Sequence, residues 1–181
     1  MSEARRHLPG DRPARDDTAR AIRVDHAGEY GAARIYAGQL AILGNGAKGD
    51  LLRHMQAQEQ HHLDTFDALI ADRRVRPTVM LPFWHLAGFA LGAVTAALGE
   101  KAAMACTVAV EETIDAHYRG QVDALTGEAA LCDTIEKFRA EEVEHRDIGL
   151  EHGAEQAPAY RLLSRVIKAG CKAAIAVSER I

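Results

Sequence analysis

The sequence predicts an all-α protein, an up-and-down bundle of four helices built from two helical hairpins. Apolar residues recur with helical periodicity, glycine- or proline-containing breaks separate the periodic stretches, and no stretch shows the alternation of a β-strand. Because the breaks are short, consecutive helices are expected to be antiparallel neighbours, although the third and fourth segments could form one long, bent helix. The expected helices span residues 17–43, 48–73, 82–98, 100–125, 129–152 and 158–179.

A single domain is expected over residues 17–181, because a chain of 181 residues with a hydrophobic content of 48% can form a sizeable core. Residues 1–16 mix arginines with acidic residues and no apolar stretch follows, so we expect a disordered tail, with a degenerate organelle-targeting segment as the alternative. The formal net charge of −4 lacks the basic footprint of nucleic-acid-binding proteins. We therefore expect no nucleic acid as a partner.

The three cysteines, Cys106, Cys132 and Cys171, are far apart in the sequence and odd in number. This pattern argues against a disulfide framework and against a thiolate zinc site. We expect all three to be small residues of the core.

Two segments contain the pattern Glu-x-x-His, at Glu59–His62 and at Glu142–His145. Residues three apart lie on one face of an α-helix, so each pair can reach the same metal ion. A single pair of this kind usually marks only a solvated helix face. Each pair here, however, has a glutamate upstream of it at nearly the same distance.

Glu29 lies 30 residues before Glu59, and Glu111 lies 31 residues before Glu142. The midpoint of the first interval falls in the glycine turn at residues 44–46, and the midpoint of the second falls at the other glycine turn. Residues equidistant from the turn of a helical hairpin come level with each other. Two hairpins packed together would therefore surround one point with four glutamates and two histidines.

This is the ligand set of ferritin-like carboxylate proteins that hold two iron or two manganese ions. Burying unpaired carboxylates is costly, so four of them together require cations. Carboxylates combined with imidazole favour iron or manganese over zinc. The predicted metal ligands are Glu29, Glu59, His62, Glu111, Glu142 and His145.

Neighbouring glutamates compete for a ligand position in two of the helices. Glu111 shares its helix face with more apolar residues than Glu112 does, and it gives the better symmetry about the turn. Glu141 could also reach the face of the histidine on its helix, but Glu142 repeats the spacing of the first half. We therefore predict that Glu111 and Glu142 are the ligands.

Five further residues are candidates for supporting roles. Tyr118 follows Glu111 by seven residues, so it returns to the metal face two turns along the helix. It could be a redox or hydrogen-bonding residue, or a tyrosine of the core. His117 lies off that face. His26, three residues before the glutamate of the first helix, is expected to support a ligand. Asp64 and Asp147 could orient ligands, but we favour ordinary surface residues.

Residues 79–98 form an apolar segment of about the length of a membrane span, without Asp, Glu, Lys or Arg. Pro82 near its start and His85 within it argue against a span. Because the arginines of residues 73–76 precede the segment, we expect an additional helix at the membrane interface, with these arginines on anionic headgroups. The alternative is a buried helix of the bundle.

Nine short motifs are spread along the chain: IRVDHAGEYGA (22–32), RIYAGQ (34–39), RVRPT (74–78), GFALG (88–92), ACTVAVEE (105–112), EEVEH (141–145), EQAPAY (155–160), AGC (169–171) and SER (178–180). Over residues 19–181 the chain resembles the demethoxyubiquinone hydroxylases (5-demethoxyubiquinol monooxygenases) of ubiquinone biosynthesis. The resemblance implies an O2-dependent monooxygenase with two iron ions (Fe2+) per chain. Family ligand positions fall on the six residues named above. Family positions linked to electron delivery or to tuning of the site fall on His117 and Tyr118, which are the candidate catalytic residues.

The implied substrate is a polyprenyl demethoxy-quinol (2-polyprenyl-3-methyl-6-methoxy-benzoquinol), whose ring is hydroxylated before the final methylation to ubiquinol. The implied partners are O2, the membrane surface and other ubiquinone-biosynthesis proteins, while the electron donor is left open between NADH and a reductase. The expected location is peripheral, on the inner face of the cell membrane in a bacterium or on the matrix side of the mitochondrial inner membrane in a eukaryote. A non-catalytic, ferritin-like iron-binding or storage protein and a metal-free helical interaction protein are the alternatives.

Overall fold

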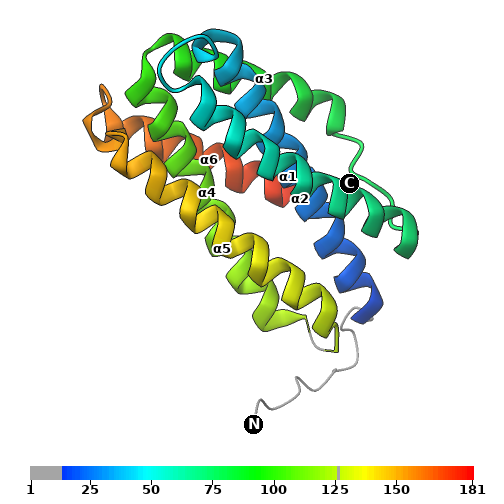
Figure 1. Ribbon diagram of the computed structural model, residues 1–181. Helices are drawn as coiled ribbons and strands as arrows, with labels where there is room; N and C mark the ends of the chain where they lie inside the picture. Colours follow the sequence, from blue (N-terminus) through cyan, green and yellow to red (C-terminus); the bar gives the residue numbers. More distant parts are fainter. Residues whose placement is uncertain (1–13, 126) are drawn as a thin grey trace.

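The structure is a computed structural model that describes residues 14–125 and 127–181 (Figure 1). Over these residues it is all-helical and contains no strand, which confirms the predicted fold class. Every helix begins and ends within three residues of its predicted bounds. The elements are α1 (Ala14–Leu43), α2 (Gly49–Arg73), α3 (Leu81–Ala97), α4 (Glu100–Ala124), α5 (Ala129–Glu151), a 3-10 helix η1 (Ala154–Gln156) and α6 (Tyr160–Ser178).

The predicted disordered tail, residues 1–16, lies outside the described residues except at its last three positions. These three positions belong to α1, which begins at Ala14, earlier than expected. The periodic apolar pattern was expected only from residue 17 onward, so the first turn of α1 was missed.

Two helical hairpins, α1–α2 and α4–α5, form the four-helix bundle (Figure 1). Both turns depend on glycine. A Cβ on Gly44 would lie 2.4 Å from the carbonyl oxygen of Leu40, and Gly127 has a φ of 85°, which other residues rarely adopt. The hairpins therefore reverse at the two glycine turns on which the ligand prediction depends.

The helices α3 and α4 are separate, as the expected bounds had them, so the alternative of one long, bent helix is wrong. α3 ends at Ala97 and α4 begins at Glu100. Gly99 lies between them with a φ of 114°, a backbone conformation that no helix contains.

Helix α3 packs closely against α1 because glycines line their contact. A Cβ on Gly88 would lie 2.8 Å from the carbonyl oxygen of Gly31, and a Cβ on Gly92 would lie 1.9 Å from that of Ile35. Both distances are shorter than real contacts, so only glycine allows the two backbones to approach in this way. The order of these contacts shows that α3 runs in the same direction as α1.

Only one face of α3 is buried, so the alternative of a helix buried in the bundle is wrong. The buried positions are Gly88, Gly92, Thr95 and Ala96. No helix in the described part of the chain is long and apolar enough to cross a membrane. Association with a membrane interface stays a prediction. The outward-facing side of α3 and the residues flanking it expose the large apolar side chains Val79, Phe83, Leu86, Phe89, Val94 and Leu98.

Helix α6 packs on α4 and α1 and is also additional to the four-helix bundle. Its Ile167 is buried, whereas Leu162 and Val166 are exposed. Of the cysteines, Cys106 is buried, but Cys132 and Cys171 are only half-buried. The prediction of three core cysteines is therefore correct for the first alone.

The apolar core of the bundle consists of clusters on either side of a polar layer. One cluster lies near the turn between α1 and α2, and another lies near the turn between α4 and α5, so the two turns are at opposite ends of the bundle. The first includes Tyr36, Leu52, Met55, Met104 and Val108. The second includes Ile22, Phe66, Tyr118, Ile135 and Phe138.

Candidate metal centre

The polar layer in the middle of the bundle contains the six residues predicted as metal ligands. α1, α2, α4 and α5 each contribute a glutamate, and α2 and α5 each add a histidine three residues further on. None of the six is more than 1% exposed. They are Glu29, Glu59, His62, Glu111, Glu142 and His145.

These residues form two overlapping groups, and in each group the ligand atoms lie within 4.8 Å of one another. The first site consists of Glu29, Glu59, His62 and Glu142. The second site consists of Glu59, Glu111, Glu142 and His145. Because Glu59 and Glu142 belong to both groups, the arrangement is suited to two cations that share two carboxylates.

Several buried atoms of this cluster have no hydrogen-bond partner among the described residues. An unpaired buried polar atom costs about 1–3 kcal/mol, and carboxylate oxygens that face one another also repel. Cations among these atoms would remove both penalties, and carboxylates with imidazole suit ions such as iron or manganese. The residues present therefore could hold a pair of divalent metal ions. The atoms without a hydrogen bond are Glu29 Oε2, both carboxylate oxygens of Glu59, Glu111 Oε2, Glu142 Oε2 and His145 Nδ1. Some of them still lie at ion-pair distance from an imidazole nitrogen, such as Glu59 Oε1 at 3.0 Å from His145 Nδ1.

The electrostatics of the cluster change the affinity of its carboxyl groups for protons. Burial raises the pKa of Glu29, Glu59 and Glu111, and the negative charge of Glu142 raises each pKa further. Without a cation, these three carboxyl groups hold protons to a higher pH than ordinary glutamates do.

The two histidines compensate part of the negative charge. Burial alone would lower the pKa of His62, but its hydrogen bonds to Glu142 and Glu29 outweigh burial and raise the pKa to about 12. Burial would also lower the pKa of His145, but the hydrogen bond to Glu142 and the negative charge of Glu111 outweigh burial and raise this pKa too. Burial would raise the pKa of Glu142, yet its hydrogen bonds with both imidazoles lower it to about 2. Protons thus occupy positions that cations could take over.

Two buried tyrosines donate hydrogen bonds to glutamates of the cluster. Tyr118 on α4 donates to Oε1 of Glu29 on α1, and Tyr36 on α1 donates to Oε1 of Glu111 on α4 over 3.1 Å. Burial raises the pKa of both phenols, so both remain donors at neutral pH. Tyr118 is therefore placed for the hydrogen-bonding role that its spacing left open. Tyr36 was missed, although it follows Glu29 by seven residues just as Tyr118 follows Glu111.

The outer ring nitrogens of both histidines also have partners. His62 Nε2 lies 2.8 Å from Oε2 of Glu141, and His145 Nε2 lies 3.0 Å from Oε1 of Gln58. When a cation replaces the proton on Nδ1, Nε2–H can still donate to these oxygens, and the lone pair of Nδ1 is then directed at the cation. Glu141 thus contacts a candidate ligand without joining either group, and Gln58 is a supporting residue that the sequence reasoning missed.

His117 lies at the edge of this region rather than in it. Its Nε2 is 2.9 Å from Nε2 of Gln121 and 3.4 Å from Oδ1 of the buried Asp25. Gln121 also donates to Asp25 over 2.7 Å. Burial raises the pKa of Asp25, and the hydrogen bond and charge of His117 act against that rise. These contacts are with Gln121 and Asp25, which belong to neither metal site, so the catalytic role of His117 stays a prediction.

The remaining candidates lie outside the cluster. His26 Nε2 lies 2.9 Å from Oδ1 of Asp67 on α2, so its partner is not one of the six residues, and no ligand-supporting contact of it is seen in the described structure. Asp64 and Asp147 are exposed and pair with residues of their own helices, which confirms the surface role we favoured. Glu112 forms an ion pair with a lysine of α6, so of the two neighbouring glutamates it is Glu111 that joins the cluster.

An apolar cavity of about 540 Å³ lies between α1, α3, α4 and α6. Gly28 and Val110 line it, and they directly precede Glu29 and Glu111. The cavity therefore borders the backbone that carries one glutamate of each site. It could hold an apolar molecule close to the candidate metal ligands.

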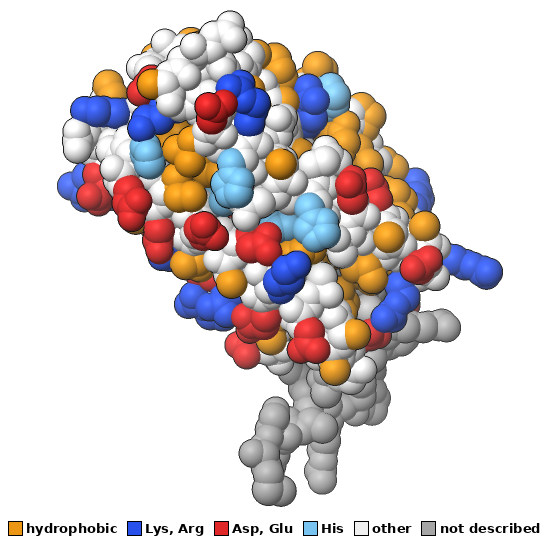
Figure 2. Space-filling model, in the orientation of Figure 1, with side chains coloured by type: hydrophobic (Ala, Val, Ile, Leu, Met, Phe, Trp, Pro, Cys, Tyr) orange, Lys and Arg blue, Asp and Glu red, His pale blue; other side chains and the backbone are white. Residues whose placement is uncertain are grey.

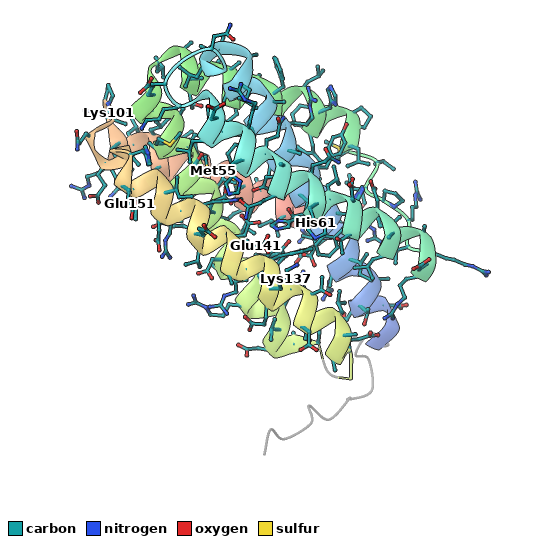
Figure 3. All side chains as sticks on the ribbon, in the orientation of Figure 1. Met55, His61, Lys101, Lys137, Glu141 and Glu151 are labelled. Carbon is teal, nitrogen blue, oxygen red and sulfur yellow. The ribbon has the colours of Figure 1, made fainter. Side chains whose placement is uncertain are left out.

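Figure 3 labels residues that neighbour the cluster, with Glu141 and Lys137 on α5 and His61 on α2 at mid-height of the bundle. His61 is exposed, unlike its neighbour His62. In Figure 2 the face of the molecule formed here by α2 and α5 carries acidic, basic and histidine side chains together. Hydrophobic side chains lie among them on this face. The apolar cavity is lined by residues of α1, α3, α4 and α6 and by none of α2 or α5.

Comparison with known proteins identifies the family of the chain. A family model described as "Ubiquinone biosynthesis protein COQ7" matches residues 16–178. The 3-demethoxyubiquinol 3-hydroxylase of Rhodospirillum rubrum is 61% identical over 176 residues, which cover 96% of this chain and 83% of that protein. The mitochondrial NADPH-dependent 3-demethoxyubiquinone 3-hydroxylase of Bos taurus is 56% identical over 172 residues (92% and 79%). The mitochondrial 5-demethoxyubiquinone hydroxylase of Saccharomyces cerevisiae is 41% identical over 180 residues (90% and 77%). The chain belongs to the COQ7 family of ubiquinone biosynthesis proteins.

Proposed function

We propose that this protein is a monooxygenase that uses O2 to hydroxylate the ring of a polyprenyl demethoxy-quinol, at two iron ions held by the first and second sites. The observation that carries the proposal is the pair of overlapping, buried Glu/His groups beside an apolar cavity. Relatives named as hydroxylases of demethoxyubiquinol or demethoxyubiquinone support the reaction and the substrate class. Because these relatives are hydroxylases, the alternative of a storage protein is not supported.

The protein side of this chemistry follows from the contacts of the cluster. Glu59 and Glu142 would serve both ions, because both residues belong to both groups. Iron bound there supplies the binding and reduction of O2. One oxygen atom enters the ring and the other leaves as water, so the reaction needs electrons and protons from a reductant. Mammalian relatives are named NADPH-dependent, which makes NADPH a candidate donor beside NADH or a reductase.

The tyrosines fix the direction of two carboxylates. Tyr118 and Tyr36 each hold one oxygen of a glutamate, Oε1 of Glu29 and of Glu111 respectively. The other oxygen of each glutamate, Oε2, is buried and faces the cluster: Glu111 Oε2 has no hydrogen-bond partner among the described residues, and Glu29 Oε2 lies 3.3 Å from His62 Nδ1. Both oxygens are therefore placed to bind a cation. Such preorganisation keeps the ligands in place before the substrate arrives.

The cavity accounts for the choice of an apolar substrate. Its lining is almost entirely apolar, with Ser178 among the few polar side chains, and it runs beside α3 and α6. An isoprenoid tail could lie in it while the ring reaches the cluster past Gly28 and Val110. Filling the cavity with the tail would also exclude water from the reacting ring.

We extend the proposal to peripheral attachment at a membrane, where a quinol with an isoprenoid tail is found. Apolar side chains of α3 and α6 are exposed beside the cavity, and Arg74 and Arg76 are exposed just before α3, within reach of anionic headgroups. Eukaryotic relatives are named mitochondrial. The expected surface is the matrix side of the mitochondrial inner membrane in a eukaryote, or the inner face of the cell membrane in a bacterium.

Vesicle binding tests this attachment. Leu86 and Val94 are 70% and 59% exposed, and burying each in a membrane would contribute about 1.5–3 kcal/mol. The double variant Leu86→Asp/Val94→Asp should therefore bind vesicles of phosphatidylcholine and phosphatidylglycerol at least about tenfold more weakly than the parent. Leu150→Asp, on α5, is the control and should bind as the parent does. Equal binding of the double variant and the parent would rule out α3 as the attachment site.

Complementation tests the reaction. Cells that lack this protein should accumulate the demethoxy-quinone, and the intact protein should restore the hydroxylated product. Glu142→Ala removes a carboxylate common to both groups and should restore none of it. Glu144→Ala is the matched control, since Glu144 is exposed on the same helix two residues away. Quinone analysis by liquid chromatography provides the measurement, and full rescue by Glu142→Ala would show that the cluster is not catalytic.

A further inference from the structure

The two halves of the chain place matching residues around the two sites. Residues of the second half follow their counterparts in the first half by 82 or 83 positions. Four of the five pairs are identical in type, and one is not. The pairs are Glu29 and Glu111, Tyr36 and Tyr118, Gln58 and Glu141, Glu59 and Glu142, and His62 and His145.

The supporting hydrogen bonds cross from one half to the other. Tyr36 of the first half donates to Glu111 of the second, and Tyr118 of the second half donates to Glu29 of the first. Each site thus has one glutamate held by one tyrosine. These two hydrogen bonds are of the same kind, so they give no reason for the sites to differ.

The supports of the histidines cross in the same way, but they differ in charge. His62 Nε2 lies 2.8 Å from a carboxylate oxygen of Glu141, whereas His145 Nε2 lies 3.0 Å from the amide oxygen of Gln58. Apart from the imidazole itself, Glu141 is ion-paired with Lys137, whose Nζ is 3.9 Å from Oε1 and whose side chain is 62% exposed. Because solvent screens the positive charge of this exposed lysine, the ion pair is weak, and the lysine offsets little of the effect of the Glu141 carboxylate on the imidazole.

A carboxylate partner makes an imidazole a stronger ligand than an amide partner does. A hydrogen bond with a charged acceptor is about twice as strong as one with a neutral acceptor, and it draws the Nε2 proton away so that Nδ1 becomes more basic. Loss of such an outer partner commonly changes metal affinity by about 10–100-fold. Phe138 stacks on the His62 ring with centroids 4.0 Å apart, which fixes the ring without adding charge.

We propose that the two metal sites are inequivalent: the first site, whose His62 is bonded to Glu141, binds a divalent ion more tightly than the second, whose His145 is bonded to Gln58. Glu141 and Gln58 are positioning residues that act through the imidazoles. The inference rests on the part of the proposed function in which the six residues bind metal, and it is independent of the reaction.

Metal occupancy at limiting Mn2+ tests this inference. Crystals of the metal-free protein equilibrated with one equivalent of Mn2+ should show the stronger anomalous scattering peak at the first site. In Glu141→Gln the ratio of first-site to second-site occupancy should fall by about tenfold or more. Gln58→Glu should lower the same ratio by strengthening the second site. The exchanged variant, Glu141→Gln with Gln58→Glu, should reverse the preference, a result that a merely structural role would not produce.

The outcomes separate this inference from the proposed function. Equal occupancy in the parent protein, preference for the second site, or an unchanged preference in the exchanged variant would overturn the inequivalence while leaving a two-metal centre intact. Absence of Mn2+ from both sites at saturation would overturn the metal centre and the inequivalence together. Two controls apply to each variant. A thermal melt shows that the fold is kept, and occupancy at saturating Mn2+ shows that both sites can still bind. A change in the ratio of first-site to second-site occupancy then reports on the relative affinities of the two sites.

Discussion

At the scale of single residues, the metal-free cluster is held together by protons. Burial raises the pKa of Glu29, Glu59 and Glu111, and hydrogen bonds to carboxylates raise the pKa of His62 to about 12 against the effect of burial. The folded, metal-free protein therefore binds more protons than the unfolded chain does. A metal ion has to displace these protons when it binds.

This proton uptake predicts a pH dependence of stability. A group whose pKa is raised by folding contributes its full stability below the unfolded pKa, near 4.5 for these glutamates, and loses it as the pH rises toward the folded value. The free energy of unfolding of the metal-free protein should therefore fall from pH 5.5 to pH 7.5. Glu142, whose pKa is lowered to about 2, acts in the opposite sense, but only at lower pH.

The stabilisation by metal should rise over the same interval, because fewer protons then compete for the ligands. At a free Mn2+ concentration of about 100 times Kd, one site adds about 2.7 kcal/mol. Urea unfolding with and without Mn2+ at pH 5.5 and pH 7.5 measures the difference. A metal-induced stabilisation that is equal at both pH values would mean that the cluster does not exchange protons for metal.

The six candidate ligands could be predicted because helix geometry relates spacing directly to position. Three residues along a helix return Glu59 and His62 to one face, and symmetry about a glycine turn brings Glu29 level with them. Tyr36 followed from the same spacing rule and was overlooked. The contact of Gln58 with His145 could not be predicted, since it depends on how α2 and α5 are rotated about their axes.

At the scale of elements, α3 shows how a helix can be predicted while its surroundings cannot. The apolar sequence of residues 79–98 indicated a helix, but it fitted an interfacial helix and a buried one equally well. The structure resolves this through close packing: Gly88 and Gly92 approach the backbone of α1, which leaves the larger side chains of α3 outside. Which face a uniformly apolar helix buries is decided by such contacts and not by periodicity.

A single methyl group at this contact should disturb the packing of α3. A Cβ on Gly92 would lie 1.9 Å from the carbonyl oxygen of Ile35, so Gly92→Ala should lower the free energy of unfolding by about 1–3 kcal/mol. Gly120→Ala is the matched control, because nothing lies within 4 Å of its added Cβ and alanine favours the helix by about 0.5–1 kcal/mol. Chemical denaturation gives both values. If Gly92→Ala proved as stable as Gly120→Ala, the close approach of α1 and α3 would be wrong.

At the scale of the whole molecule, two hairpins that turn at opposite ends of the bundle bring their matching positions to a common centre. The internal repeat of the sequence made this arrangement predictable. The cavity was not predictable, because its lining comes from α1, α3, α4 and α6 and depends on the placement of the two helices outside the bundle. A polar cluster of candidate metal ligands thus lies beside an apolar cavity, which is the combination that the proposed substrate requires.

Iron content tests the central claim most directly. Protein loaded with Fe2+ under anaerobic conditions should retain two ions per chain, one for each group. Glu29→Ala affects only the first site and should retain about one ion, while Glu59→Ala affects both sites and should retain fewer. Metal analysis after desalting gives the numbers. Absence of iron from the parent protein, or two ions retained by Glu59→Ala, would contradict a two-metal centre built from these residues.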